Sequence, residues 1–185
     1  MEILCEVSVR HVHLSKKDLE TLFGKKAELE IVRPLSQPGQ FLSNQRVSLV
    51  GPKNTIEGVA VLGPTRKETQ VEISRTDVYT LGLKDVPLRQ SGDIEGAPMV
   101  NIVVGDNKIE GHAIVAKRHV HLDPATAKRE DLRDGELVKV SVNGERSVIF
   151  NNVVVRVNEC YMPAVHLDAD EGNAAAAGPT ALVFK

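Results

Sequence analysis

The sequence predicts an all-β fold, either a sandwich or a barrel of many short strands. Aromatic residues make up only 3% of the 185 residues and tryptophan is absent, so Val, Ile, Leu and Ala have to build the core. β-Branched side chains pack well on a pleated sheet. Short runs of such residues recur between Gly, Pro and Asn turn signals, and no long amphipathic helical pattern is present.

Ten runs are expected to form strands. Asn143-Gly144 lies between two alternating, Val-rich runs and predicts a β-hairpin. The expected strands are Ile3–Val9, Ala27–Val32, Arg46–Val50, Thr55–Leu62, Gln70–Ile73, Met99–Val104, Ile109–Ala116, Leu137–Val142, Ser147–Val157 and Ala181–Phe184.

Two short helices are expected between the strands. The first begins at Ser15, with Asp18 three residues later as an approximate capping box, and ends at Gly24. The second begins at Asp123, with Pro124 at the first helical position, where the missing N–H has no cost.

The composition excludes several classes of partner. The net charge of −2 gives no basic field for nucleic acid or an anionic membrane, and no apolar run approaches the ~20 residues of a membrane span. The N-terminus lacks the pattern of a secretory signal. Cys5 and Cys160 form no Cys-x-x-Cys pair and are expected to be reduced, buried thiols. These features favour an intracellular protein that binds neither nucleic acid nor membrane.

The chain carries one internal duplication. The pentapeptide Arg-His-Val-His-Leu occurs at 10–14 and again at 118–122, and each copy directly precedes an expected helix. Similarity elsewhere is weak. We therefore infer a constraint that acts on the pentapeptide itself.

The duplicated histidines predict a metal site. In an extended segment alternate side chains share a face, so His11 and His13 point one way, as do His119 and His121. A single His-x-His is more often a pair of half-exposed strand histidines, but duplication favours metal ligation. His166 follows as a fifth candidate.

The residues around His166 leave two interpretations open. Asp168 or Asp170 could orient an imidazole, as metal-bound histidines require, or could lie in a turn or at a helix N-cap. His112 has no partner motif and is expected to be structural or exposed. Imidazoles with a carboxylate and without paired thiolates suit zinc. Two tetrahedral ions take about eight ligands, so five histidines and one carboxylate leave room for water or substrate.

A second dense stretch runs from Gly63 to Asp77. Its Gly-Pro turn displays Arg66, whose guanidinium fork matches phosphate geometry, and the strand after it turns Glu72 to its polar face. Taken alone, both are more often surface residues. Their combination with the histidines favours phosphate binding by Arg66 and metal ligation by Glu72.

These motifs resemble a known family, the PduL-type phosphate propanoyltransferases, which are phosphotransacylases associated with bacterial microcompartments and propanediol degradation. The resemblance covers nearly the whole chain. It rests on the duplicated pentapeptide, on Leu62-Gly63-Pro64 with Thr69-Gln70-Val71-Glu72-Ile73-Ser74, and on His166-Leu167-Asp168 with Asp170-Glu171-Gly172-Asn173.

The resemblance implies two fused, interlaced β-barrels with short capping helices and two zinc ions between them. One barrel would comprise residues 1–9 and 117–185 and the other residues 10–116, whereas composition and spacing alone suggest a split near 88–96. Arg66 would bind phosphate, and Asn173 would lie near the site. The implied metal ligands are His11, His13, Glu72, His119, His121 and His166.

The chain departs from the family pattern in two ways. Val9 stands where members often carry Asn before the first pentapeptide, which affects one polar contact and no metal ligand. The N-terminal extension that targets members to a microcompartment lumen is not seen, so a cytoplasmic location is expected. The oligomeric state, a homo-oligomer included, is left open.

The expected reaction is reversible: acyl-CoA and phosphate give acyl phosphate and CoA, by direct attack in a ternary complex. The acyl group is propanoyl or acetyl, since one methylene contributes only ~1–3 kcal/mol to discrimination. Two rivals remain. One is a zinc hydrolase that activates water, and the other is a noncatalytic, metal-stabilised binding module.

Overall fold

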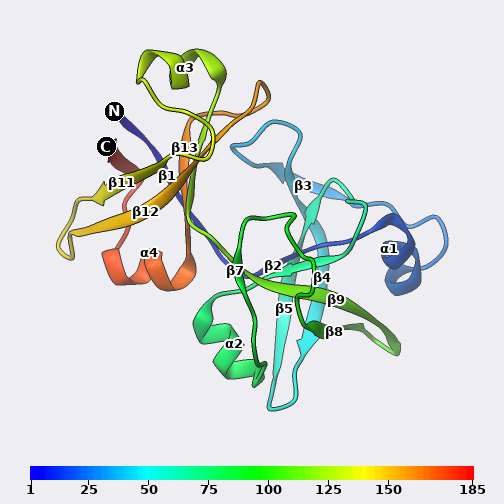
Figure 1. Ribbon diagram of the computed structural model, residues 1–185. Coiled ribbons are helices and arrows are strands. Elements are labelled where there is room, and N and C mark those ends of the chain that lie inside the picture. The colour runs from blue at the N-terminus through cyan, green and yellow to red at the C-terminus, as the bar shows by residue number, and fades with distance from the viewer. The chain divides into compact units, whose positions relative to one another are not determined.

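The computed structural model describes residues 1–185 and confirms an all-β fold, with two closed six-stranded barrels and four short helices (Figure 1). The chain divides into two compact units. Unit 1 comprises Met1–Val9 and Lys117–Lys185, and unit 2 comprises Arg10–Ala116. The 88–96 stretch, where composition suggested a boundary, lies inside unit 2.

Unit 1 is a barrel closed in the order β1-β13-β10-β12-β11-β14. Its ends meet through antiparallel pairing of β1 with β14, and the Met1 amino group donates to the Val183 carbonyl at 2.8 Å, so both chain termini lie side by side (Figure 1). β11 and β12 form the hairpin that Asn143-Gly144 predicted. The strands are β1 (Glu2–Ser8), β10 (His119–Leu122), β11 (Leu137–Val142), β12 (Val148–Val157), β13 (Ala164–Asp168) and β14 (Thr180–Phe184).

Unit 2 closes in the order β9-β6-β2-β5-β4-β8, with β8 paired to both β4 and β9. Two further strands, β3 and β7, extend it at β4 and β9. The strands are β2 (His11–His13), β3 (Ile31–Pro34), β4 (Phe41–Val50), β5 (Thr55–Gly63), β6 (Gln70–Glu72), β7 (Leu88–Arg89), β8 (Met99–Val104) and β9 (Asn107–Ala116).

Both barrels have the same topology. Each pentapeptide strand, β2 or β10, pairs in parallel with β5 or β12 and antiparallel with β6 or β13. The strand before each pentapeptide belongs to the other unit: β1 precedes β2, and β9 precedes β10. The duplication therefore extends over the whole chain, and the two repeats exchange their first strands.

Four helices flank the barrels, two more than the sequence predicted. The expected pair, α1 (Lys16–Phe23) and α3 (Pro124–Arg129), has Ser15 and Asp123 as N-caps. The additional helices α2 (Arg75–Leu81) and α4 (Ala169–Ala175) directly follow β6 and β13. Each has only seven residues, too few to show a clear helical period.

Two other expectations were wrong. Ala27 does not begin a strand, because its amide N–H donates to the Gly24 carbonyl in the turn after α1; β3 starts only at Ile31. Cys5 is buried in the core of unit 1, as expected, but Cys160 is exposed, and both thiols are free.

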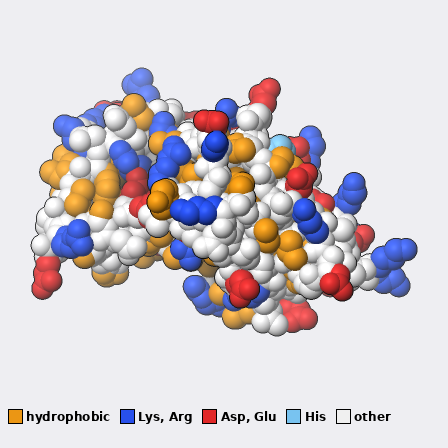
Figure 2. Space-filling view, turned by 90° about the horizontal axis from the view of Figure 1, so that it is seen from below, with side chains coloured by type: hydrophobic (Ala, Val, Ile, Leu, Met, Phe, Trp, Pro, Cys, Tyr) orange, Lys and Arg blue, Asp and Glu red, His pale blue; other side chains and the backbone are white.

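Each barrel has its own core of aliphatic side chains, in which the pentapeptide takes part. Val120 and Leu122 are buried in unit 1, and Val12 and Leu14 are buried in unit 2. On the face shown in Figure 2, Lys and Arg side chains are interspersed with Asp and Glu, in keeping with the small net charge. None of the helices has the length and apolar character that crossing a membrane requires.

Candidate metal centres

The first cluster lies in unit 2 and joins His11 and His13 of β2 to Glu72 of β6. The ring nitrogen Nε2 of His11 lies 3.6 Å from one oxygen of Glu72, and Nε2 of His13 lies 3.7 Å from the other. His11 stands directly opposite Glu72 in the β2–β6 ladder, and Val12 points away into the core. One ligand atom from each of the three residues lies within 4.8 Å of the others, which suits a single metal ion.

The charges in this cluster favour metal binding. Burial, together with the neighbouring charges of His11 and Arg66, lowers the pKa of His13 to about 3. Burial alone would raise the pKa of Glu72, but the adjacent His11 and the hydrogen bond from Ser91 hold it well below its ordinary value. A neutral imidazole and an ionised carboxylate are the forms that ligate metals.

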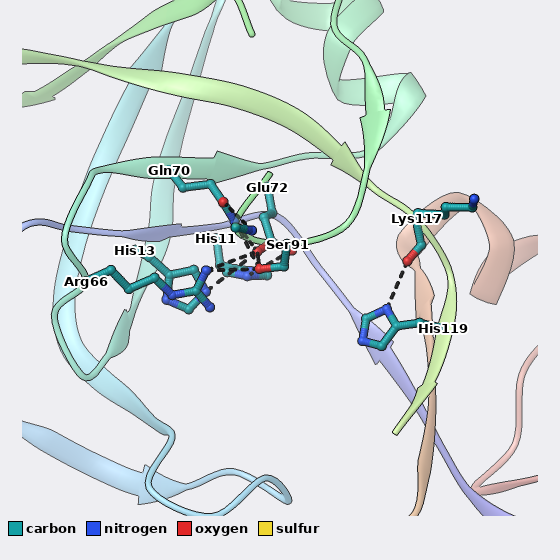
Figure 3. A network of polar contacts seen from close by, with 9 residues as sticks. His11, His13, Arg66, Gln70, Glu72, Ser91, Lys117 and His119 are labelled. Carbon is teal, nitrogen blue, oxygen red and sulfur yellow. Dashed lines mark hydrogen bonds and ion pairs between the residues drawn. The ribbon is translucent and has the colours of Figure 1, made fainter. Parts of the chain in front are cut away.

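Arg66 and Ser91 form the polar edge of the first cluster (Figure 3). Ser91 donates to Oε1 of Glu72 at 2.5 Å and accepts from Nη1 of Arg66 at 2.9 Å. Gln70 donates to the same Glu72 oxygen at 2.5 Å and accepts from the Gly92 amide. The sequence gave no sign of Ser91, because it lies in a loop after β7 without any motif. The structure brings it to the cluster through contacts with distant residues.

The second cluster lies in unit 1 and consists of three histidines. His119 and His121 come from β10, and His166 comes from β13 directly opposite His119. The ring centroids of the three imidazoles lie 4.5–4.9 Å apart. A three-histidine set with room for a further ligand is typical of catalytic zinc.

Backbone and carboxylate groups orient two of these rings. Nδ1 of His119 lies 2.9 Å from the Lys117 carbonyl, which can only accept, so the Nδ1–H tautomer donates there and Nε2 would be the nitrogen that ligates a metal. Nδ1 of His166 lies 3.6 Å from Glu6 of β1. Of the two interpretations that the sequence left open for Asp168, the structure supports the helix N-cap, because its side chain accepts from the Glu171 amide at the start of α4.

His121 provides the test of whether a metal fits. Both of its ring nitrogens are buried without a hydrogen-bond partner, an arrangement that is unfavourable unless a ligand satisfies one of them. Burial lowers its pKa to about 2, helped by His119, His166 and Arg156, so the ring is neutral. Tyr161 stacks on it with ring centroids 3.9 Å apart. The donors of this cluster fit a transition metal.

The two clusters occupy equivalent places in the two barrels. Glu72 faces His11 across the β2–β6 ladder, just as His166 faces His119 across the β10–β13 ladder. The third residue of the cluster is therefore a glutamate in unit 2 and a histidine at the equivalent position of unit 1.

The remaining candidates lie outside both clusters. Asn173 is exposed on α4, and its backbone carbonyl accepts from the Ala176 amide. His112 was not expected to be a metal ligand, and its Nδ1 lies 3.2 Å from the Ala97 carbonyl.

Comparisons with known proteins identify a family and several relatives of the chain. The family model described as phosphate propanoyltransferase matches residues 4–178. The chain is 50% identical to a phosphate propanoyltransferase of Alkaliphilus metalliredigens over 181 residues, which cover 97% of this chain and 85% of the relative. It is also 50% identical to one of Thermotoga maritima over 186 residues, covering 98% and 88%. The corresponding protein of Listeria monocytogenes is 48% identical over 172 residues, covering 91% and 80%.

Proposed function

Because the chain belongs to the phosphate propanoyltransferase family, and is therefore an acyltransferase with phosphotransacylase chemistry, we propose a zinc-dependent transfer of a short acyl group between coenzyme A and phosphate. The family implies a CoA thioester and phosphate as substrates. The identity of the metal, the direct attack and the roles of individual residues are our proposals.

The observation that carries the proposal is the position of Arg66 beside a buried, metal-type cluster. Its Nη1 lies 3.9 Å from Glu72, and its side chain is 32% exposed, so the guanidinium lines the cluster and still meets solvent. A guanidinium fork binds phosphate through two parallel N–H···O bonds. Ser91, which is hydrogen-bonded to the same Arg66, adds a hydroxyl at this edge. A phosphate held here would be positioned for attack on the thioester, and such positioning of reactants can lower the activation barrier by ~7 kcal/mol or more.

Two zinc ions would be held separately by the two clusters. One would take His11, His13 and Glu72, and the other would take His119, His121 and His166. When bound, zinc would act as a Lewis acid that stabilises negative charge on the thioester oxygen or on the departing thiolate.

We propose direct transfer without a covalent acyl-enzyme. An oxygen of phosphate attacks the thioester carbonyl carbon, the carbon–sulfur bond breaks, and CoA leaves as the thiolate; the reverse reaction retraces these steps. Cys5 is a poor nucleophile, because burial raises its pKa and keeps the thiol protonated. Arg66 and Ser91 would hold the attacking phosphate throughout.

The test is an assay for free CoA released from propanoyl-CoA and acetyl-CoA, with and without phosphate, by protein of measured zinc content. We expect release that requires phosphate and yields acyl phosphate. Release without phosphate would instead indicate a hydrolase, and no turnover of either thioester would indicate a noncatalytic module. When the thioester and phosphate concentrations are both varied, double-reciprocal plots of the initial rate are expected to give intersecting lines. Parallel lines would refute the direct attack.

A further inference from the structure

The first residue of the pentapeptide is arginine in both copies, and metal ligation gives it no role. In the structure each of these arginines forms an ion pair with the carboxylate of an acidic side chain. Nε and Nη2 of Arg10 contact Oδ1 of Asp77 at 2.9 and 2.8 Å, and Nη1 of Arg118 donates to Oε1 of Glu171 at 2.6 Å. The two ion pairs recur at equivalent places, since Asp77 and Glu171 are each the third residue of the helix that follows β6 or β13.

Each acid divides its two oxygens between the arginine and a capping box. Oδ2 of Asp77 accepts from the amide of the N-cap Ser74, and Oε2 of Glu171 accepts from the amide of the N-cap Asp168, both at 3.1 Å. The other oxygen receives the arginine in each case. One carboxylate therefore ties the end of a ligand-bearing strand to the residue just before the His-x-His strand.

The strands that carry the first cluster are short. β2 and β6 have only three residues each, and Glu72 is the last residue of β6, two positions before the N-cap. So short a ladder contains few backbone hydrogen bonds. A metal site, in contrast, needs its ligands held to within about 0.2 Å of their ideal distances.

We propose that the pairs Arg10–Asp77 and Arg118–Glu171 are positioning pairs, each of which sets the spacing between the His-x-His strand and the third ligand of its own cluster. This inference rests on the proposed metal binding. Burial supports it for the first pair, because the Asp77 side chain is only 3% exposed and its partner fixes it beside the end of β6. In the second pair Arg118 also donates to the Asn151 carbonyl of β12 at 2.7 Å, so it ties a third strand to the cluster.

The chain supplies its own matched controls, since each pair is expected to act on one cluster only. The variants His121→Ala and His13→Ala, made in the full-length chain, each leave one cluster intact for measurement. Arg10→Gln and Arg118→Gln are then introduced into both backgrounds. Zinc affinity is measured by competition with a chromophoric chelator, and the cobalt(II) absorption spectrum reports ligand geometry.

We expect a crossed result. Arg10→Gln should weaken zinc binding about 10-fold or more where only the first cluster remains, the usual effect of losing an outer contact of a metal site, and should leave the second cluster within about twofold. Arg118→Gln should do the reverse. Arg10→Lys, which keeps the charge and loses the fork, should give an intermediate loss and covers the case in which Arg10→Gln fails to fold.

A helix control separates positioning from general stability. Ser74→Ala removes the side-chain cap of α2 and keeps the Arg10–Asp77 pair, so it should lower Tm without changing zinc affinity or the cobalt spectrum. Equal weakening of both clusters by Arg10→Gln, an effect of Ser74→Ala as large as that of Arg10→Gln, or no change at all would overturn the proposal. A wild-type chain that binds neither zinc nor cobalt would refute the proposed metal dependence itself, and the positioning pairs with it.

Discussion

Replacing Arg66 by alanine removes the proposed phosphate ligand and leaves the metal ligands intact. The guanidinium of Arg66 carries five N–H donors, of which Nη1 donates to Ser91, and a bidentate pair with phosphate would use two donors. Each charge-assisted hydrogen bond contributes about 1.5–3 kcal/mol. Loss of two such bonds therefore corresponds to about 3–6 kcal/mol, or about two to four orders of magnitude in kcat/KM for phosphate.

The structure also predicts what Arg66→Ala leaves unchanged. Glu72 keeps its hydrogen bonds from Gln70 and Ser91, so the first cluster should bind zinc as before. The assay is CoA release at several phosphate concentrations, together with elemental analysis of the same samples. Lys67→Ala is the control, because this exposed neighbour should change kcat/KM less than about twofold.

Two results would refute the role of Arg66. One is a variant that retains more than about a tenth of the wild-type kcat/KM for phosphate. The other is a loss of zinc in proportion to the loss of activity, because Arg66 would then act on the cluster and not on the substrate.

Three further predictions follow from the structure. His119→Ala should lower the zinc content by one equivalent, and elemental analysis that still finds two would remove this residue from the ligand set. Gly172→Ala should lower the free energy of unfolding in urea by about 1–3 kcal/mol, because the new methyl group would lie 2.5 Å from a valine of β1. Gly178→Ala is the control, since open space surrounds this glycine and the change should be neutral. Equal effects of the two changes would contradict this packing. In a thiol titration Cys160 should react rapidly and Cys5 only after unfolding, and two fast thiols would show that Cys5 is not buried.

The fold class could be predicted from sequence because it depends on local patterns. Runs of β-branched residues give strands, and the N-caps Ser15 and Asp123 mark two helices. The helices α2 and α4 also had a local signal, the acid three residues after Ser74 and after Asp168, but each is too short to add a recognisable period. The expectation of two barrels came from family resemblance, since strand patterns do not distinguish a sandwich from a barrel.

Only part of the candidate site could be predicted from the sequence, because only part of it depends on local patterns. The alternation of side chains in a strand places His11 beside His13, and the structure has their rings 5.0 Å apart. Ser91 and Glu6 reach the clusters through contacts with residues far away in sequence, and neither carries a motif. A sequence shows such residues only as an ordinary loop serine and an ordinary strand glutamate.

The exchange of first strands has a consequence for synthesis on the ribosome. All six strands of the unit 2 barrel lie within residues 10–116, so this barrel can close while the chain is still growing. β1 is made first, yet it pairs Ser8 with Asp168. At about 5–20 residues per second it waits roughly ten to thirty seconds for its partner. The oldest segment of the chain is thus among the last to be ordered, and the histidines at 119, 121 and 166 can gather only after nearly all of the polypeptide has emerged.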